Sequence, residues 1–239
     1  MPQDTHFQAL GSIERSTRRE RILNKLRTAV SSGQLPPGTH LAETELSAQL
    51  GVSRGTLREA LRHLQQEGLL SKDARGRLSV RVVTAREVGE IFDVRYALES
   101  LAISVICEQP ISPAVAASLQ AALEILEQSE SGDIEGQVDA DLAFHEAICQ
   151  ASGNQTLVDS WRRVSGLARA SITAAGRETA RDNMSAARHA PILGAVLEGD
   201  AQQAMAVLKA HNDSARERIV INMEPDGAGK KSPAPRPAV

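Results

Sequence analysis

The amino-acid sequence predicts a mainly α-helical protein, with an N-terminal winged helix-turn-helix followed by a C-terminal all-α helical bundle. Three observations lead to this prediction. Residues 41–70 read as two short helices joined by a tight turn, a basic hairpin follows them, and from residue 84 to about residue 220 the apolar residues recur at helical spacing. Aromatic residues make up only 2% of the chain, so its core must consist of Leu, Ala, Ile and Val, which suits packed helices.

Composition and periodicity divide the chain into four segments. Residues 1–16 are polar and without period, which predicts a flexible arm, and residues 224–239 are rich in Pro, Gly and Lys, which predicts a disordered tail. Between these ends we expect the winged helix-turn-helix over residues 17–83 and the helical bundle over residues 84–223.

Two helices with a sharp break between them are predicted over residues 43–50 and 54–67. Gly51 supplies the left-handed backbone that ends the first helix, and the side-chain oxygen of Ser53 caps the second. The second helix is expected to bury Leu57, Leu61 and Leu64. Its outer face opens with the small and basic residues Arg54, Gly55, Thr56 and Arg58. Such a helix start can approach base edges, as a recognition helix must, although any amphipathic helix also has a polar face.

A basic hairpin is predicted directly after this helix. Residues 69–72 and 77–83 flank the turn at residues 73–76, and alternation places Leu78, Val80 and Val82 on the buried face of the second strand. Arg75, Gly76 and Arg77 lie at the tip. A glycine there lets backbone approach a duplex, and the arginines offer positive charge to phosphates or to the minor groove. The hairpin is therefore interpreted as the wing.

The first third of the chain resembles the GntR family of bacterial transcription regulators. The resemblance rests on five motifs: Gly33-x-Leu35-x-Pro37-Gly38, Leu41-x-Glu43, Leu50-Gly51-Val52-Ser53-Arg54, Leu57-Arg58-Glu59-Ala60-Leu61 and Glu67-Gly68-Leu69. It implies that Arg54 and Arg58 contact guanine edges or phosphates, and that Ser53 and Thr56 bind the DNA backbone. Many relatives carry an arginine where this chain has Thr44, so the operator sequence cannot be transferred from them.

Charge is unevenly distributed along the chain. Residues 1–82 contain 13 Lys or Arg against 8 Asp or Glu, whereas residues 83–239 contain 14 against 22. A weakly basic unit joined to an acidic one fits one DNA-binding domain and one domain that does not touch DNA. Cys107 and Cys149 are isolated in apolar helical runs, which predicts buried thiols, and no run is long enough to span a membrane. We therefore expect a cytoplasmic protein.

Capping signals and breaks divide the second half into six expected helices. Thr84 and Glu87 repeat the capping-box spacing of Thr17 and Glu20. The first long helix covers about residues 87–108 and is expected to bury Val88, Ile91, Leu98, Leu101, Val105 and Ile106. The other helices are expected from Ser112, from Gly132–Gly136, from Ser152–Asn154 to about Gly176, from Asp182–Ser185 to Leu197, and over residues 201–221. Pro191 is tolerable only near the first turn of its helix or at a kink.

Histidines provide the second constellation. Asp141 and His145 are four residues apart, so both side chains project from one face of a helix, where they can bind one divalent ion or simply form a helix-stabilising pair. His189 precedes the turn at Gly199-Asp200 by about ten residues and His211 follows it by about eleven. An antiparallel helix pair around that turn would place these two histidines side by side.

The helical half resembles the FCD effector domain found in the FadR-type branch of GntR regulators. The matching motifs are Val94-Arg95-x-x-Leu98-Glu99, Asp141-x-x-Phe144-His145, Ser152-Gly153-Asn154, His189-x-x-Ile192, Gly199-Asp200 and His211. The resemblance implies a divalent metal held by Asp141, His145, His189 and His211, against the alternative of core histidines. Such a ligand set suits zinc, nickel, cobalt, manganese or iron(II). It disfavours the fatty acyl-CoA ligand of relatives that lack these residues.

The same resemblance implies that a small organic carboxylate completes the metal coordination. Arg95 is our candidate cation for that carboxylate, because a guanidinium pairs with it bidentately. The alternative for Arg95 is an ion pair with Glu99 one turn away. Asn183 and Arg169 are further candidates for the wall of the effector site.

We interpret the chain as a ligand-responsive transcriptional regulator, and expect a repressor that binds a palindromic double-stranded operator as a homodimer. One small winged helix contacts too few base pairs to be selective alone. Two alternatives remain. The metal ion itself could be the signal, or the four ligands could belong to a helical metalloenzyme, for which the sequence offers no nucleophile motif or phosphate-binding loop.

Overall fold

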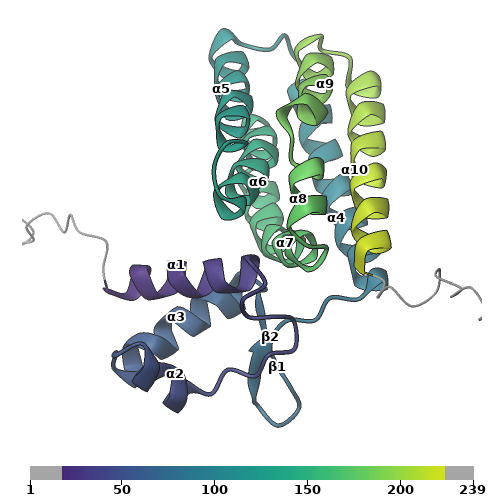
Figure 1. Cartoon of the computed structure of the whole chain (residues 1–239). Coiled ribbons are helices and arrows are strands. Elements are labelled where there is room, and N and C mark those ends of the chain that lie inside the picture. The colour runs from purple at the N-terminus through teal and green to yellow at the C-terminus, as the bar shows by residue number, and fades with distance from the viewer. Residues whose placement is uncertain (1–17, 224–239) are drawn as a thin grey trace, which may run out of the picture.

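The computed structural model describes residues 18–223, and it shows a small N-terminal unit beside a larger helical bundle (Figure 1). The predicted arm (residues 1–16), the capping box at Thr17 and the predicted tail (residues 224–239) lie outside the described residues.

The N-terminal unit is a winged helix-turn-helix, as predicted. It contains α1 (Arg18–Ser31), α2 (Glu43–Gln49), α3 (Arg54–Gln66), β1 (Leu70–Lys72) and β2 (Leu78–Val80). Leu57, Leu61 and Leu64 are buried, and Gly51 has the expected positive φ of 61°. Because α3 packs on α1 and α2 through these leucines, its opposite face remains exposed beside the wing.

The wing is shorter than expected. The two strands are antiparallel, with Leu70 opposite Val80 and Lys72 opposite Leu78. Val82 was expected on the buried face with Leu78 and Val80, but its side chain is 58% exposed, so this prediction is wrong. The last residue pair is Leu70 opposite Val80. One further hydrogen bond joins the backbone N–H of Arg81 to the carbonyl oxygen of Leu69 at 2.9 Å, and the chain then leaves the hairpin towards the bundle.

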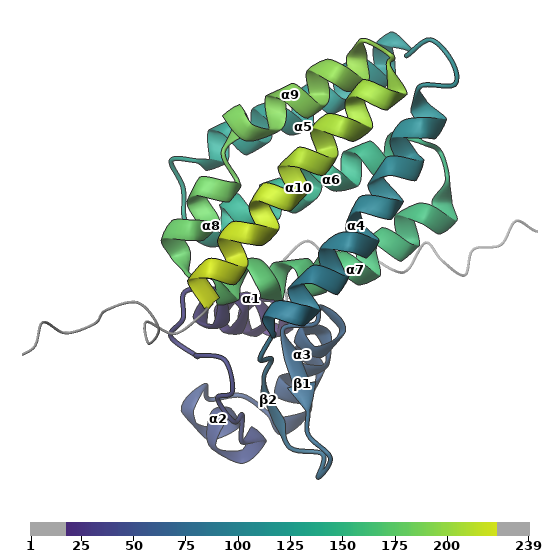
Figure 2. The same cartoon turned by 90° about the vertical axis from the view of Figure 1, so that its right-hand side faces the viewer.

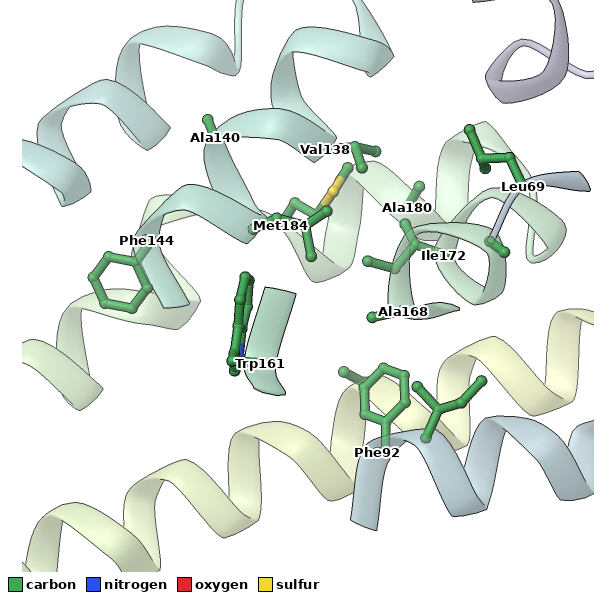
Figure 3. Close-up of a cluster of buried hydrophobic side chains, with 14 of the residues drawn as sticks. Leu69, Phe92, Val138, Ala140, Phe144, Trp161, Ala168, Ile172, Ala180 and Met184 are labelled. Atoms are coloured by element: carbon green, nitrogen blue, oxygen red, sulfur yellow. The ribbon is translucent and has the colours of Figure 1, made fainter. Parts of the chain in front are cut away.

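The second unit is all helical. Its helices are α4 (Ala85–Ile106), α5 (Pro113–Ser129), α6 (Ile134–Ala151), α7 (Gln155–Ala174), α8 (Arg177–Asn183), α9 (Ala186–Leu197) and α10 (Ala201–Met223). The capping box at Thr84 and Glu87 is present, and Ser112, Asp133 and Asn154 cap the next three helices. Trp161 of α7 lies among the buried apolar side chains that join these helices (Figure 3).

Three details differ from the sequence-based expectation. A separate short helix, α8, follows Gly176, whose positive φ of 86° breaks the chain after α7. Pro191 lies in the second turn of α9, where its ring occupies the exposed side. Leu101 is 49% exposed rather than buried, because the inner face of α4 carries the buried pair Arg95 and Glu99 instead.

The winged helix packs against the bundle through α1 and the end of α3, which lie next to α6 and α7 (Figure 2). Gly166 of α7 lies so close to the end of α3 that a Cβ atom there would be 2.0 Å from the carbonyl oxygen of Glu67. Arg27 of α1 binds the Glu67 carboxylate at 2.6 Å, and Thr28 binds Glu135 of α6. Helices α6 and α7 therefore form the surface of the bundle on which the DNA-binding unit packs.

No helix within residues 18–223 combines the length and the apolar character that crossing a bilayer requires.

Candidate DNA-binding face and metal centre

The start of α3 is exposed and well ordered by hydrogen bonds. The Oγ atom of Ser53 accepts a hydrogen bond from the backbone N–H of Thr56 at 3.1 Å and lies 2.8 Å from the Thr56 hydroxyl. Arg54 follows the cap with its side chain in solvent. A capped helix N-terminus also presents free backbone N–H groups, so this end of α3 can receive a phosphate or a base edge.

Arg58, the second predicted base-contacting residue, is bound to an acid on α2. Its Nη2 atom lies 2.8 Å from Oε2 of Glu43, and the two side chains are 68% and 36% exposed. Exposed ion pairs are weak because water screens them, so a DNA phosphate or guanine can replace Glu43 at little cost. The pair holds Arg58 on the same face as Arg54.

The wing tip is exposed and shaped by one carboxylate. Oδ1 of Asp73 accepts hydrogen bonds from the backbone N–H groups of Arg75 and Arg77, each at 2.9 Å, and Oδ2 binds Nε of Arg77 at 2.7 Å. These bonds, led by the Arg77 N–H, lower the pKa of Asp73 below its usual value. Gly76 adopts a positive φ of 76°, and Arg75 and Arg77 both remain exposed. The tip is thus a rigid basic loop.

The four predicted metal ligands come together inside the bundle. The ligating nitrogens of His145 (α6), His189 (α9) and His211 (α10) all lie within 4.8 Å of one another. The Nε2 atoms of His145 and His189 are 3.2 Å apart, and Oδ1 of Asp141 lies 3.1 Å from Nε2 of His189. All four side chains are buried. The level position of His189 and His211 around the α9–α10 turn is as expected.

Outer hydrogen bonds fix the orientation of two imidazoles. Nδ1 of His145 lies 2.9 Å from Oε2 of Glu99, and Nδ1 of His189 lies 2.9 Å from the carbonyl oxygen of Ser185. Both acceptors lack a proton, so each Nδ1 carries the hydrogen and each Nε2 atom is left with a lone pair. Histidines that bind a metal are typically oriented by such bonds from their other ring nitrogen.

The inner atoms fit a cation. The lone pairs of two Nε2 atoms and one carboxylate oxygen face one another at 3.1–3.2 Å, which is repulsive unless a positive charge lies between them. Two ligands at right angles on a metal with bonds of about 2.1 Å stand about 3.0 Å apart, so the spacing agrees with coordination. His211 adds a further nitrogen donor, and its Nδ1 atom has no hydrogen-bond partner among the described residues.

The protonation of the cluster favours metal binding. Burial lowers the pKa of His145 and of His211 below the usual value, so both imidazoles are neutral at pH 7. Burial alone would raise the pKa of Asp141, but the close contact with His189 and the nearby His145 and Arg95 outweigh that effect and lower the pKa. His145 and His211 therefore present neutral imidazoles and Asp141 presents a carboxylate, which are the forms that bind a divalent ion.

The structure places the candidate effector-binding residues in different parts of the molecule. Nε of Arg95 binds Oε1 of Glu99 at 2.7 Å in a pair that is 3% and 0% exposed, whereas Nη2 of Arg95 has no hydrogen-bond partner in residues 18–223. Arg95 therefore forms the expected ion pair with Glu99 and still has one nitrogen available for an effector carboxylate. Asn183 of α8 is buried, with its Nδ2 atom donating to the carbonyl oxygen of Ala215 and its Oδ1 atom unpartnered there.

Arg169 lies elsewhere. It binds Asp139 and lines a recess between the bundle and the DNA-binding unit, together with Arg27, Glu67 and Arg162. The structure does not bring it to the metal centre.

Sequence reasoning missed two amides and the role of Glu99. Asn212 and Gln137 are buried, and both amide atoms of Asn212 and Oε1 of Gln137 lack a hydrogen-bond partner among the described side chains and backbone. Asn212 follows His211 directly, and Gln137 precedes Asp141 by one helical turn. A polar residue next to a ligand, or one turn from it, on an otherwise apolar helix was the available signal.

Comparison with known proteins identifies both units. Residues 18–80 match the model of the gntR family of bacterial regulatory proteins, and residues 90–214 match that of the FCD domain. The chain is 32% identical over 202 residues to an HTH-type transcriptional regulator of Streptomyces ambofaciens, with 82% of each protein covered. It is 32% identical over 149 residues to the regulator YdhC of Bacillus subtilis, which covers 60% of this chain and 65% of YdhC.

A gluconate operon transcriptional repressor of Bacillus licheniformis is 28% identical over 153 residues, covering 64% of this chain and 62% of the repressor. Among solved structures, a GntR transcriptional regulator from Rhodococcus sp. RHA1 superposes with a TM-score of 0.67 at 26% identity, covering 85% of this chain and 97% of that one. These relatives are regulators rather than enzymes, as expected. The chain belongs to the GntR family of bacterial transcription regulators, with a winged helix-turn-helix that binds DNA and an FCD domain.

Proposed function

We propose that this chain is a metal-dependent, ligand-responsive repressor of the FadR-type branch, which binds a palindromic operator as a homodimer. Asp141, His145, His189 and His211 would hold one divalent ion. The observation that carries the proposal is the convergence of lone pairs from His145, His189 and Asp141 at 3.1–3.2 Å in a buried site. A bound ion supplies a Lewis-acidic anchor there, onto which a carboxylate can bind.

The class of effector is inferred from buried polar atoms of the bundle that lack partners among the described residues. The buried guanidinium of Arg95 has a free Nη2 atom, and Asn183 and Asn212 supply amide atoms without partners among residues 18–223. Buried polar atoms without partners cost roughly 1–3 kcal/mol each, so a ligand that satisfies them gains affinity. A small organic acid fits best, because its carboxylate would meet both the metal and Arg95.

DNA recognition is assigned to one face of the first unit. Arg54 and Arg58 would contact base edges or phosphates, Ser53 and Thr56 would bind the backbone, and the wing tip Arg75-Gly76-Arg77 would contact phosphates or the minor groove. A homodimer would place two such faces on a two-fold operator. Repression is proposed because the gluconate operon relative is named a transcriptional repressor.

Two measurements test this function. Isothermal titration calorimetry of EDTA-treated protein with Zn²⁺, Ni²⁺ and Mn²⁺ should show one site per chain, and His189→Ala should remove it. A mobility shift with a palindromic operator from the protein's own promoter should show specific binding that is lost when Arg54 and Arg58 are both replaced by Ala. Specific binding that survives both arginine substitutions would contradict the DNA assignment.

A second interpretation makes the metal the signal, without an organic ligand. It is favoured by the burial of the four ligands, which leaves His211 at 9% exposure as the most accessible of them. Operator affinity measured against Zn²⁺ alone, and then with simple carboxylates added at saturating Zn²⁺, distinguishes the two interpretations.

A further inference from the structure

Glu99 connects the candidate metal centre to α7. Its Oε2 atom accepts a hydrogen bond from Nδ1 of His145 at 2.9 Å. Its Oε1 atom accepts two, from Nε of Arg95 at 2.7 Å and from the indole Nε1 of Trp161 at 3.0 Å. Glu99 is 0% exposed and Trp161 is 1% exposed. One buried carboxylate therefore holds a candidate metal ligand, the candidate effector cation and a side chain of α7.

The electrostatic setting keeps this carboxylate charged. Burial would raise its pKa, but His145 and Arg95 outweigh that effect and lower the pKa of Glu99 to about 2. An ionised acceptor forms stronger hydrogen bonds than a neutral one, and three donors share it. A change at any one donor must therefore alter the bonds to the other two.

Helix α7 also makes a close backbone contact with the DNA-binding unit. Five residues beyond Trp161, Gly166 lies against Glu67, the C-cap residue of the recognition helix α3. A Cβ on Gly68 would meet Gly166 carbonyl carbon at 3.2 Å and Leu167 Cδ2 at 3.0 Å. With so little space between the two backbones, a displacement of α7 has to displace the end of α3.

We propose that Glu99 and Trp161 are positioning residues that carry the occupancy of the metal centre, through α7 and Gly166, to the recognition helix. The proposal rests on the proposed function. If Nε2 of His145 held a cation, its Nδ1–H would be a stronger donor to Glu99. A carboxylate beside the cation competes with Glu99 for Arg95, through the unpartnered Nη2 atom. Either event changes the bond that Glu99 makes to Trp161.

Trp161 supplies a direct readout, because it is the only tryptophan in the chain. Zn²⁺ does not quench indole emission by electron transfer, so a change in emission reports the surroundings of the ring. In full-length, EDTA-treated protein we expect the emission to shift with Zn²⁺ and to saturate at the stoichiometry found by calorimetry. Zn²⁺ binding without any change in emission would overturn the inference. Absence of Zn²⁺ binding would overturn the proposed function, and the inference with it.

The second experiment measures coupling as the ratio of operator dissociation constants with and without saturating Zn²⁺. Allosteric coupling typically amounts to about 5–150-fold. We expect a wild-type ratio in that range, falling to within about twofold of unity in Trp161→Phe and in Gly166→Ala. Zn²⁺ affinity should stay within about threefold of wild type in both variants, since neither Trp161 nor Gly166 is a ligand or hydrogen-bonds to one directly.

A matched glycine controls for the effect of adding a methyl group to a helix. A Cβ on Gly194 of α9 would have nothing within 4 Å, so Gly194→Ala should retain the wild-type ratio. Glu99→Gln should lose the coupling and weaken Zn²⁺ binding about 10–100-fold. If Glu99→Gln does not fold, the ratios measured for Trp161→Phe and Gly166→Ala still test the inference. A wild-type ratio near one, or the same ratio in wild type, Trp161→Phe and Gly166→Ala, would overturn the inference.

Discussion

The two candidate sites of this protein are built in opposite ways. On the DNA-binding face, the arginines are exposed, and Arg58 and Arg77 are each held by an acid within the same small unit. In the metal centre, buried residues from α6, α9 and α10 meet, and Glu99 of α4 and the carbonyl oxygen of Ser185 orient two of them. The first site consists of nearly independent contacts, whereas the second works only as a complete set.

This difference has an energetic basis. An exposed ion pair is screened by water and changes little when one partner leaves. A buried polar group that loses its partner keeps the whole cost of its desolvation. We therefore expect substitutions on the DNA-binding face to act gradually and additively, and substitutions in the metal centre to act strongly and together.

The largest effect is expected from His189→Ala. His189 lies within 3.2 Å of both His145 and Asp141, so its loss removes a ligand at the centre of the set. Because loss of a residue that only orients a ligand weakens metal binding about 10–100-fold, loss of this ligand should exceed about 100-fold. Calorimetry with Zn²⁺ measures it. His63→Ala, a change on the winged helix, is the control, and an equal loss there would contradict the assigned ligand set.

Arg54→Ala should have the next largest effect. Arg54 is exposed at the capped start of α3, and a side chain that reads a base contributes about 1–3 kcal/mol, so operator affinity should fall about 10–100-fold. Zn²⁺ binding should be unchanged. Arg86→Ala removes an exposed arginine from the bundle and should leave operator affinity within about twofold. A similar loss in both variants would indicate general charge attraction rather than recognition.

The two regions also differ in how far the sequence predicts them. The winged helix follows local rules: Ser53 caps α3, Gly51 and Gly68 end helices, and three leucines at helical spacing are buried. Its one error concerns Val82, because alternation alone does not reveal that β1 ends after three residues.

In the bundle, apolar spacing placed Val88, Ile91 and Ile106 of α4 correctly in the core but misplaced Leu101. Leu101 was expected inside, yet the buried stripe contains Arg95 and Glu99, which face the histidine cluster. A charged pair at i and i+4 looks the same in sequence whether it is solvated or buried. The ligands could be named from spacing and family motifs, but the bonds from Glu99 to His145 and Trp161 join residues 46 and 62 positions apart, which no local pattern encodes.

Arg81, Thr84 and Glu87 form the joint between the DNA-binding unit and the bundle, and we expect substitutions there to lower stability moderately. Thr84 caps α4 and forms a capping box with Glu87, which also binds Arg81 at 2.9 Å. Loss of such a cap costs about 1 kcal/mol, so Thr84→Ala should lower the midpoint of thermal unfolding by about 2–4 °C. Zn²⁺ affinity should not change. Ser112→Ala removes a helix cap within the bundle. It should lower the midpoint of thermal unfolding by a similar amount and leave operator affinity unchanged.

The same joint predicts a dependence on pH. The Thr84 N–H bond, the Thr84 hydroxyl and Arg81 lower the pKa of Glu87 in the folded protein below its unfolded value of 4.5. A carboxyl group whose folded pKa is lowered contributes stability above its unfolded pKa, and that stability is lost as the pH falls through the folded pKa. Glu87→Gln should therefore destabilise the protein at pH 7 more than at pH 3. An equal effect at both values in chemical denaturation would contradict this assignment.

The smallest effect is expected from Glu43→Gln, and its direction is informative. Glu43 holds Arg58 at 2.8 Å in the free protein and must release it before Arg58 can bind DNA. Since an exposed ion pair is weak, its removal should raise operator affinity by about fivefold at most. Glu45→Gln removes the same charge from the same turn of α2 and accounts for general repulsion of DNA. If both variants bind the operator equally tightly, Glu43 acts only by its negative charge. Its ion pair with Arg58 then does not compete with DNA binding.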